Sequence, residues 1–115
     1  MEITAHEFEG ITVLEIEGNI IGPPTSSLLS TRLNDLVNAG KNKIILDLAK
    51  VDWINSSGIG IITKALQMIR KHNGDLKLAR PLYKVKNILQ ITNFVKIIDI
   101  FDSIDKAIIQ FKLEF

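Results

Sequence analysis

Residues 52–62, DWINSSGIGII, decide how this chain is organised. An apolar run, Ile44–Leu46, comes shortly before them and suits a strand buried on both faces, whereas apolar residues at helical spacing follow them. Two serines and two glycines therefore stand where a strand gives way to a helix. The first N–H groups of a helix have no partner within it and carry the positive end of its dipole, so a hydroxyl there caps the helix and a phosphate there is stabilised. The stretch predicts a helix start that another molecule touches or modifies.

On either side of this stretch, the hydrophobic pattern alternates between strand and helix. The expected elements are strands at 3–8 and 11–17, a helix from 25 to 40, a strand at 43–48, a helix at 58–72, a strand at 75–80, a helix at 81–93, a strand at 96–101 and a last helix after 103. Such alternation implies right-handed crossovers and a mostly parallel sheet. We therefore expect a single α/β domain over residues 1–115, with an N-terminal hairpin, a mixed, mostly parallel sheet and about four helices.

Cap residues set the expected ends of two helices. Thr25 or Ser26 is expected to cap the first helix, since a side-chain oxygen can accept from the unpaired N–H groups there, and Gly40 is expected to end it. Asp102 or Ser103 is expected to cap the last helix in the same way.

The composition excludes several classes of protein. The chain has no cysteine, so disulfides, thiol catalysis and cysteine-based metal sites are excluded. This composition fits the reducing cytoplasm, where we expect the protein to act. No segment has the pattern of a signal peptide, and no apolar run approaches the roughly 20 residues that span a bilayer. We therefore expect no membrane insertion.

The charges are unevenly distributed, although the net charge is only +1. Residues 1–52 hold eight acidic and four basic residues (−4), residues 53–98 hold eight basic and one acidic (+7), and residues 99–115 hold four acidic and two basic (−2). The basic residues of the middle segment are Lys64, Arg70, Lys71, Lys77, Arg80, Lys84, Lys86 and Lys96. They could form one basic face, but a solvated surface is the more ordinary interpretation. Because the segment lacks interleaved aromatic side chains for stacking on bases, we expect no nucleic acid partner.

The motifs of common enzymes are incomplete in this chain. A Gly-x-Ser-x-Gly motif centred on Ser57 would need glycine where Asn55 and Ile59 stand. His6 and His72 are expected in a strand and at a helix end, and nothing in the pattern places either beside Ser57. The P-loop motif is missing, the dinucleotide motif lacks its third glycine, and no metal-ligand spacing occurs. We therefore expect no catalytic activity, no cofactor and no metal.

Two interpretations of the strand–helix junction remain open. In the first, Ser57 simply caps a helix, and Gly58 and Gly60 allow tight packing. In the second, the junction is a binding surface. Each glycine weakens a helix by about 0.5–1 kcal/mol relative to alanine, and the isoleucines that follow supply more apolar surface than one buried face needs. Both observations favour the binding surface.

Three parts of the chain form a recognisable pattern: the strand IILDL at 44–48, the stretch VDWINSSGIG at 51–60, and the C-terminal segment from Ile97 through Ala107. With this pattern the chain resembles the STAS domains, and among them the small bacterial anti-sigma factor antagonists. The resemblance extends over essentially the whole chain. It implies the STAS fold and a protein-binding switch rather than an enzyme.

The resemblance also implies the partners and the site. The unphosphorylated protein would bind a serine kinase that doubles as an anti-sigma factor and has a histidine-kinase-like ATPase fold, and this binding would free the sigma factor. Phosphorylation of the second serine of the signature, here Ser57, would break the complex, and a serine phosphatase would restore it. The kinase would bring the ATP. The residues expected to face the partner are Asn55, Ser56, Ser57, Gly58, Ile59 and Gly60.

The chain departs from the family pattern at two positions. Asn55 stands where the family often has aspartate before the serines, and Ile21 stands where it often has aspartate after the second strand. Asparagine can hydrogen-bond but cannot act as a base, so we expect Asn55→Asp to speed phosphorylation. The alternative is a STAS module in another signalling or transporter-associated assembly, where Ser57 is not phosphorylated.

Overall fold

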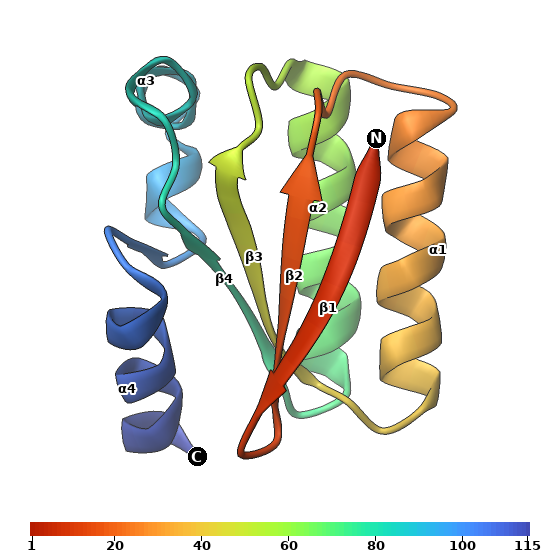
Figure 1. The fold of residues 1–115 in the computed structure, drawn as a ribbon, viewed down its shortest axis with the longest axis vertical. Helices are drawn as coiled ribbons and strands as arrows, with labels where there is room; N and C mark the ends of the chain where they lie inside the picture. Colours follow the sequence, from red (N-terminus) through yellow and green to blue (C-terminus); the bar gives the residue numbers. More distant parts are fainter.

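The computed structural model describes residues 1–115 and contains one five-stranded sheet with helices on both faces (Figure 1). Its elements are β1 (Glu2–Phe8), β2 (Ile11–Glu17), α1 (Thr25–Asn38), β3 (Lys43–Lys50), α2 (Ser56–Lys71), β4 (Asp75–Ala79), α3 (Tyr83–Ile91), the 3-10 helix η1 (Phe94–Lys96), β5 (Ile100–Phe101) and α4 (Ile104–Glu114). The sheet order is β1-β2-β3-β4-β5; β1 and β2 are antiparallel, and the other neighbours are parallel. The predicted α/β fold, hairpin and four α-helices are confirmed.

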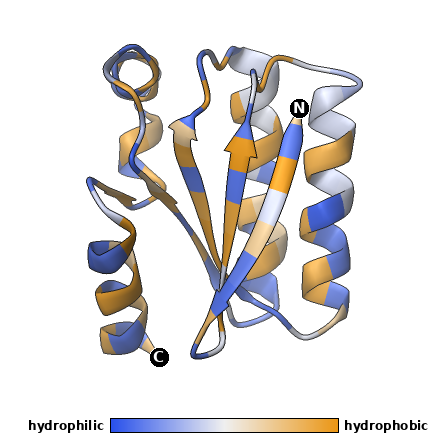
Figure 2. Ribbon diagram, viewed as in Figure 1, coloured by the Kyte–Doolittle hydropathy of each residue, from blue (hydrophilic) through white to orange (hydrophobic).

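The sheet separates a large hydrophobic core from a small one. Alternate residues of β3 show the division, because Ile44 and Leu46 belong to the large core beneath α1 and α2, whereas Ile45 belongs to the small core beneath α4. All three are completely buried, as expected for a strand covered on both faces. In Figure 2 the first turn of α2 is pale because it holds serine and glycine, in contrast to the coloured turns that follow.

The start of α1 differs from the prediction. Pro24 occupies the N-cap position, and no side chain caps the helix. Thr25 and Ser26 lie inside the first turn, where the N–H of Ser26 donates to the carbonyl of Gly22 over 3.0 Å. A backbone turn in the preceding loop therefore replaces the side-chain cap. The C-terminal end of α1 agrees with the prediction, because Gly40 follows the helix with a left-handed φ of +81°.

Two later elements are shorter than predicted. The helix expected from Pro81 begins only after Leu82 and ends at Ile91, because Asn93 turns the chain with a φ of +60°. The strand expected at 96–101 pairs with β4 only at Ile100–Phe101. The reason is that Phe94 and Ile98, both 3% exposed, turn into the core at helical spacing, so this stretch does not alternate as a strand would.

The end of β4 and the start of α4 show how charged and polar side chains set boundaries. The strand was expected to include Arg80, but it ends at Ala79, and Arg80 takes a left-handed φ of +55°. Strict alternation would have placed this arginine on the core side with Leu78; instead its guanidinium pairs with Asp47 on the other face. At α4, Ser103 is the cap, and its oxygen accepts from the Lys106 N–H over 3.1 Å. Of the two predicted caps, Asp102 and Ser103, the structure thus shows the second.

No helix of the chain combines the length and hydropathy needed to cross a membrane.

Candidate functional site

The loops that follow β2 and β3 lie side by side at one end of the sheet, at the top of Figure 1. Ile20 and Ile54 form a parallel bridge, and the N–H of Ile20 donates to the Trp53 carbonyl over 2.9 Å. The N–H of Asn55 in turn approaches the Ile20 carbonyl at 3.4 Å. These bonds extend the pairing of β2 and β3 beyond their ends, so α2 begins on a platform of two joined loops.

Asn55 caps α2 and joins both loops. Its Oδ1 accepts from the N–H of Gly58 over 3.0 Å, and its Nδ2 donates to the carbonyl of Ile21 over 2.9 Å. Its own carbonyl accepts from the N–H of Ile59 over 2.9 Å, which is the first full turn of the helix. The helix therefore starts at Ser56, two residues earlier than predicted, and an asparagine rather than a serine hydroxyl is the cap.

Ser56 and Ser57 occupy the first two positions of α2, and both are exposed. Because Asn55 provides the cap, neither hydroxyl is needed to hold the helix. The N–H groups of the first turn and the helix dipole favour negative charge here, and the first turn of α2 contains no acidic residue. The site can therefore accept a phosphate on a serine, although exposure alone does not separate Ser57 from Ser56.

The two glycines of the signature have different environments. Gly58 is buried, and a Cβ built on it would lie 2.0 Å from the carbonyl oxygen of Ile20 and 2.9 Å from the side chain of Ile54. Glycine at this position lets α2 lie directly on the loop after β2. The structure thus gives Gly58 a packing role within its own chain, and its expected contact with a partner stays a prediction. Gly60 is exposed, and a Cβ there would meet nothing within 4 Å, whereas Ile59 is half-buried against the core.

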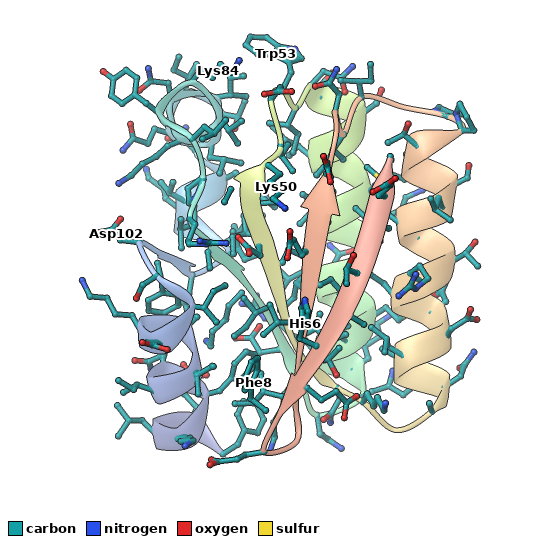
Figure 3. All side chains as sticks on the ribbon, in the orientation of Figure 1. His6, Phe8, Lys50, Trp53, Lys84 and Asp102 are labelled. Atoms are coloured by element: carbon teal, nitrogen blue, oxygen red, sulfur yellow. The ribbon has the colours of Figure 1, made fainter.

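Large apolar side chains flank the serines from both loops. Ile21 is 44% exposed, and Trp53 is 47% exposed and projects from the end of the molecule in Figure 3. Their main-chain carbonyls accept hydrogen bonds within the platform, so the backbone from which each apolar side chain projects is fixed. The sequence pattern indicates no role for either side chain. Both are exposed because Ile20 and Ile54 take the two buried positions beside them.

The two histidines lie away from the serines. His6, on β1, is 3.7 Å from Glu15 on β2, and His72 stands at the far end of α2, where its Nδ1 is 2.9 Å from the Met68 carbonyl. The structure therefore places no histidine where it could act as a base toward Ser57. A serine that another enzyme modifies needs no such base in its own chain.

The basic residues of the middle segment do not form one face. Arg70 pairs with Asp75, Arg80 with Asp47 and Lys86 with Asp102. The Arg80 guanidinium makes two hydrogen bonds to Asp47, at 3.0 and 2.6 Å, and these raise the pKa of Arg80. The basic residues of the middle segment are therefore better described as parts of an ordinary solvated surface than as one basic patch.

Three carboxylates come close enough together to resemble a metal site, but a lysine fills the space. Oxygens of Asp75, Asp99 and Glu114 lie within 4.8 Å of one another, and the completely buried Lys77 Nζ lies 3.2, 2.7 and 3.0 Å from them. Burial by itself lowers the pKa of Lys77, but the three hydrogen-bonded carboxylates outweigh it and the pKa is raised above 10.5. The Lys77 ammonium therefore occupies the space that a metal ion would need, and it joins α4 to the sheet.

Comparison with known proteins identifies the family. Residues 2–107 match the model of the STAS domain, and the chain belongs to this family, which confirms the resemblance seen in the sequence. BtrV of Bordetella bronchiseptica, described as a candidate anti-sigma factor antagonist, is 24% identical over 112 residues that cover 97% of this chain and 96% of BtrV. A candidate anti-sigma factor antagonist of Thermotoga maritima is 36% identical over 74 residues, 64% of this chain and 66% of its own length.

A solved structure agrees with the fold. The crystal structure of a candidate anti-sigma factor antagonist from Thermotoga maritima superposes with a TM-score of 0.89 at 27% identity, and the match covers 96% of this chain and 94% of that one. The order of strands and helices described above is therefore that of a STAS domain.

Proposed function

We propose that this protein is an anti-sigma factor antagonist whose binding to an anti-sigma factor is switched by phosphorylation of Ser57. Two relatives, one matching 97% and the other 64% of this chain, are described as candidate anti-sigma factor antagonists, which supports the proposal. The observation that carries the proposal is that Ser57 is exposed in the first turn of α2, where the side chain of Asn55 and not a serine provides the cap. Modification of Ser57 can then change the surface without undoing the helix.

In this proposal the partner is a serine kinase of histidine-kinase-like ATPase fold that also acts as the anti-sigma factor. The unphosphorylated protein sequesters it, and the sigma factor is released. The kinase supplies the ATP and the catalytic groups, so this chain only has to present the Ser57 hydroxyl. A serine phosphatase returns the protein to its binding state.

The physical basis of the switch is the unequal environment of the phosphate in the free protein and in the complex. A phosphate adds about −1.5 to −2 charges at neutral pH. In the free protein, water and the positive end of the α2 dipole stabilise this charge. In the complex, the charge would have to lose water beside the apolar side chains of Ile21 and Trp53, which is costly. Phosphorylation therefore leaves the fold intact and opposes binding.

Calorimetric titration of the purified kinase with the wild type and three variants, together with a phosphorylation assay, tests the proposal. Ser57→Asp should bind much more weakly than the wild type, whereas Ser57→Ala should bind as well and should not be phosphorylated. Ser56→Ala is the matched control and should bind and be phosphorylated as the wild type is. Equal affinities of the Ser57→Asp and wild-type proteins would contradict the proposed switch.

A further inference from the structure

Gly60 lies where the fold itself does not need a glycine. Its φ is not in the left-handed region, and a Cβ on it would meet no atom within 4 Å. Gly58 is the opposite case, because a Cβ there would overlap the carbonyl of Ile20. A glycine within a helix weakens it relative to alanine, so Gly60 lowers stability without improving the packing of its own chain. The missing side chain leaves room for something outside the chain.

Gly60 belongs to an exposed stripe that begins at Ser57 and continues along α2. Its members follow one another at intervals of three or four residues, the spacing of one helix face, and all are exposed. We call them the α2 stripe: Ser57, Gly60, Lys64, Gln67 and Lys71.

The α2 stripe carries positive charge only. The helix contains no acidic residue, and although Arg70 beside the stripe is paired with Asp75, neither Lys64 nor Lys71 is in an ion pair. A surface of this kind attracts acidic groups, and the attraction raises the rate at which an acidic partner binds. Two unpaired lysines without aromatic neighbours make a poor site for nucleic acid, so an acidic protein surface is the better match.

We propose that the α2 stripe is the surface on which the anti-sigma factor lies, with the partner in contact with the backbone of α2 at Gly60 and an acidic patch of the partner opposite Lys64. This inference rests on the proposed function and adds the chemistry of the partner to it. It also gives the phosphate a second effect. Phosphorylation of Ser57 would put negative charge at one end of a surface that binds an acidic partner, and like charges would repel.

The test uses variants of Gly60 and Lys64 with controls on α4, which lies on the other face of the sheet. Gly60→Ala and Gly60→Gln add a small and a large side chain, both from good helix formers, and Lys64→Glu reverses a charge. Lys106→Gln and Lys106→Glu are the matched controls, because Lys106 is exposed on α4 and is in no ion pair. For each protein, urea unfolding gives the stability, and calorimetry without ATP gives the affinity for the purified serine-kinase anti-sigma factor encoded in the same genome.

The two Gly60 variants should unfold at the same or a higher urea concentration than the wild type and yet bind more weakly, by about 10-fold for alanine and more for glutamine. Lys64→Glu should bind about 10-fold more weakly at low salt, and the difference should shrink at high salt. Both Lys106 variants should bind as the wild type does.

Each other result overturns a defined part of the argument. If the wild type binds the kinase and Gly60→Gln binds equally well, the α2 stripe is not the interface, and the proposed function stands. If the Gly60 variants are less stable than the wild type, the glycine is structural and the inference is wrong. If a duplex oligonucleotide binds the wild type and not Lys64→Glu, the stripe serves nucleic acid instead. If the wild type does not bind the kinase at all, the proposed function fails and the inference fails with it.

Discussion

The side chain of Asn55 holds the backbone of Ile21 in place, because its Nδ2 donates to the Ile21 carbonyl oxygen over 2.9 Å. Through Oδ1 it also accepts from the N–H of Gly58, so one side chain joins the loop after β2 to the start of α2. Aspartate, which the family often has at this position, could keep the bond to Gly58 but not the one to Ile21, since a carboxylate has no proton to donate. The departure from the family pattern therefore has a structural consequence.

Asn55→Asp is expected to make the protein less stable and its phosphorylation faster. Loss of one hydrogen bond should lower the free energy of unfolding by about 1 kcal/mol, as measured in urea. The carboxylate oxygen that replaces the Asn55 amide nitrogen cannot bond to the Ile21 carbonyl and would be free to take the Ser57 proton. A general base typically adds about 10²–10⁴ in rate. Single-turnover phosphorylation by the same kinase measures this effect. An unchanged or slower rate would mean that Asn55 is only a structural residue of the loop.

Gly58 and Gly60 are expected to respond oppositely to alanine. Gly58→Ala puts a methyl group against the Ile20 carbonyl, and such overpacking should lower the free energy of unfolding by about 1–3 kcal/mol. Gly60→Ala meets no atom and should raise it by about 0.5–1 kcal/mol, the difference in helix propensity. Urea unfolding of both variants in parallel decides. A loss of stability in both would show that the second glycine also serves the fold.

The hydrophobic pattern was sufficient to predict the mixed, mostly parallel sheet and the order of strands and helices along the chain. The run at Ile44–Leu46 and the alternation of β1 and β2 depend on residues that are close in sequence, and such patterns survive in the folded protein. The predicted bounds of the later strands were wrong where contacts between residues distant in sequence determine the structure. Phe94 and Ile98 turn into the core and prevent a longer strand, and Arg80 leaves the strand to reach Asp47.

At the site, the sequence indicated the serines and glycines but not their division of roles. Asparagine is a favoured N-cap residue, and Asn55 stands three residues before Gly58, so its capping preference is the signal in the sequence that indicates the cap. The contact of Gly58 with Ile20 joins residues 38 positions apart, and no local pattern indicates it. The exposure of Trp53 could likewise not be predicted from the sequence, because its neighbours determine which side chains of the loop are buried.

Lys77→Met is expected to loosen α4. Methionine keeps the apolar stem but removes the ammonium that Asp75, Asp99 and Glu114 share, and hydrogen bonds to charged groups contribute about 1.5–3 kcal/mol. We expect the free energy of unfolding to fall by about this amount. Amide hydrogen exchange should show faster exchange in α4, the element that Glu114 ends, than in α2. Lys106→Met, an exposed lysine of the same helix, is the control, and an equal effect in both variants would contradict the role of the buried ammonium.

Acid is expected to destabilise the protein, in part through Glu15. The hydrogen bond from Lys50, whose Nζ is 2.7 Å from Oε1, holds the pKa of Glu15 below its usual value of 4.5. A carboxyl with a lower pKa in the folded state stabilises the fold above its unfolded pKa, and this contribution is lost as the pH falls through 4.5 to the folded value.

Urea midpoints measured from pH 7 to pH 3 should therefore decrease below about pH 4.5. Lys50→Met removes the partner of Glu15, so the decrease should be smaller in this variant than in the wild type. Lys96→Met, an exposed lysine in no ion pair, should leave the pH dependence unchanged. Identical curves for Lys50→Met and the wild type would show that this surface pair does not contribute to stability.

Incubation with the kinase and ATP should place a single phosphate on Ser57. The hydroxyl is exposed in the first turn of α2, on the same helix face as the bare backbone of Gly60, and the cap that Asn55 provides stays in place when the serine is modified. Ser56 is also exposed. Gly60 stands four residues after Ser56 and three after Ser57, so both serines lie on the helix face of Gly60, and mapping has to identify the modified one. Peptide mapping by mass spectrometry of the wild type, Ser56→Ala and Ser57→Ala identifies the site. Phosphate on Ser56, Ser26 or Ser103 would contradict the assignment, and loss of phosphorylation in Ser56→Ala alone would move the switch to the first serine.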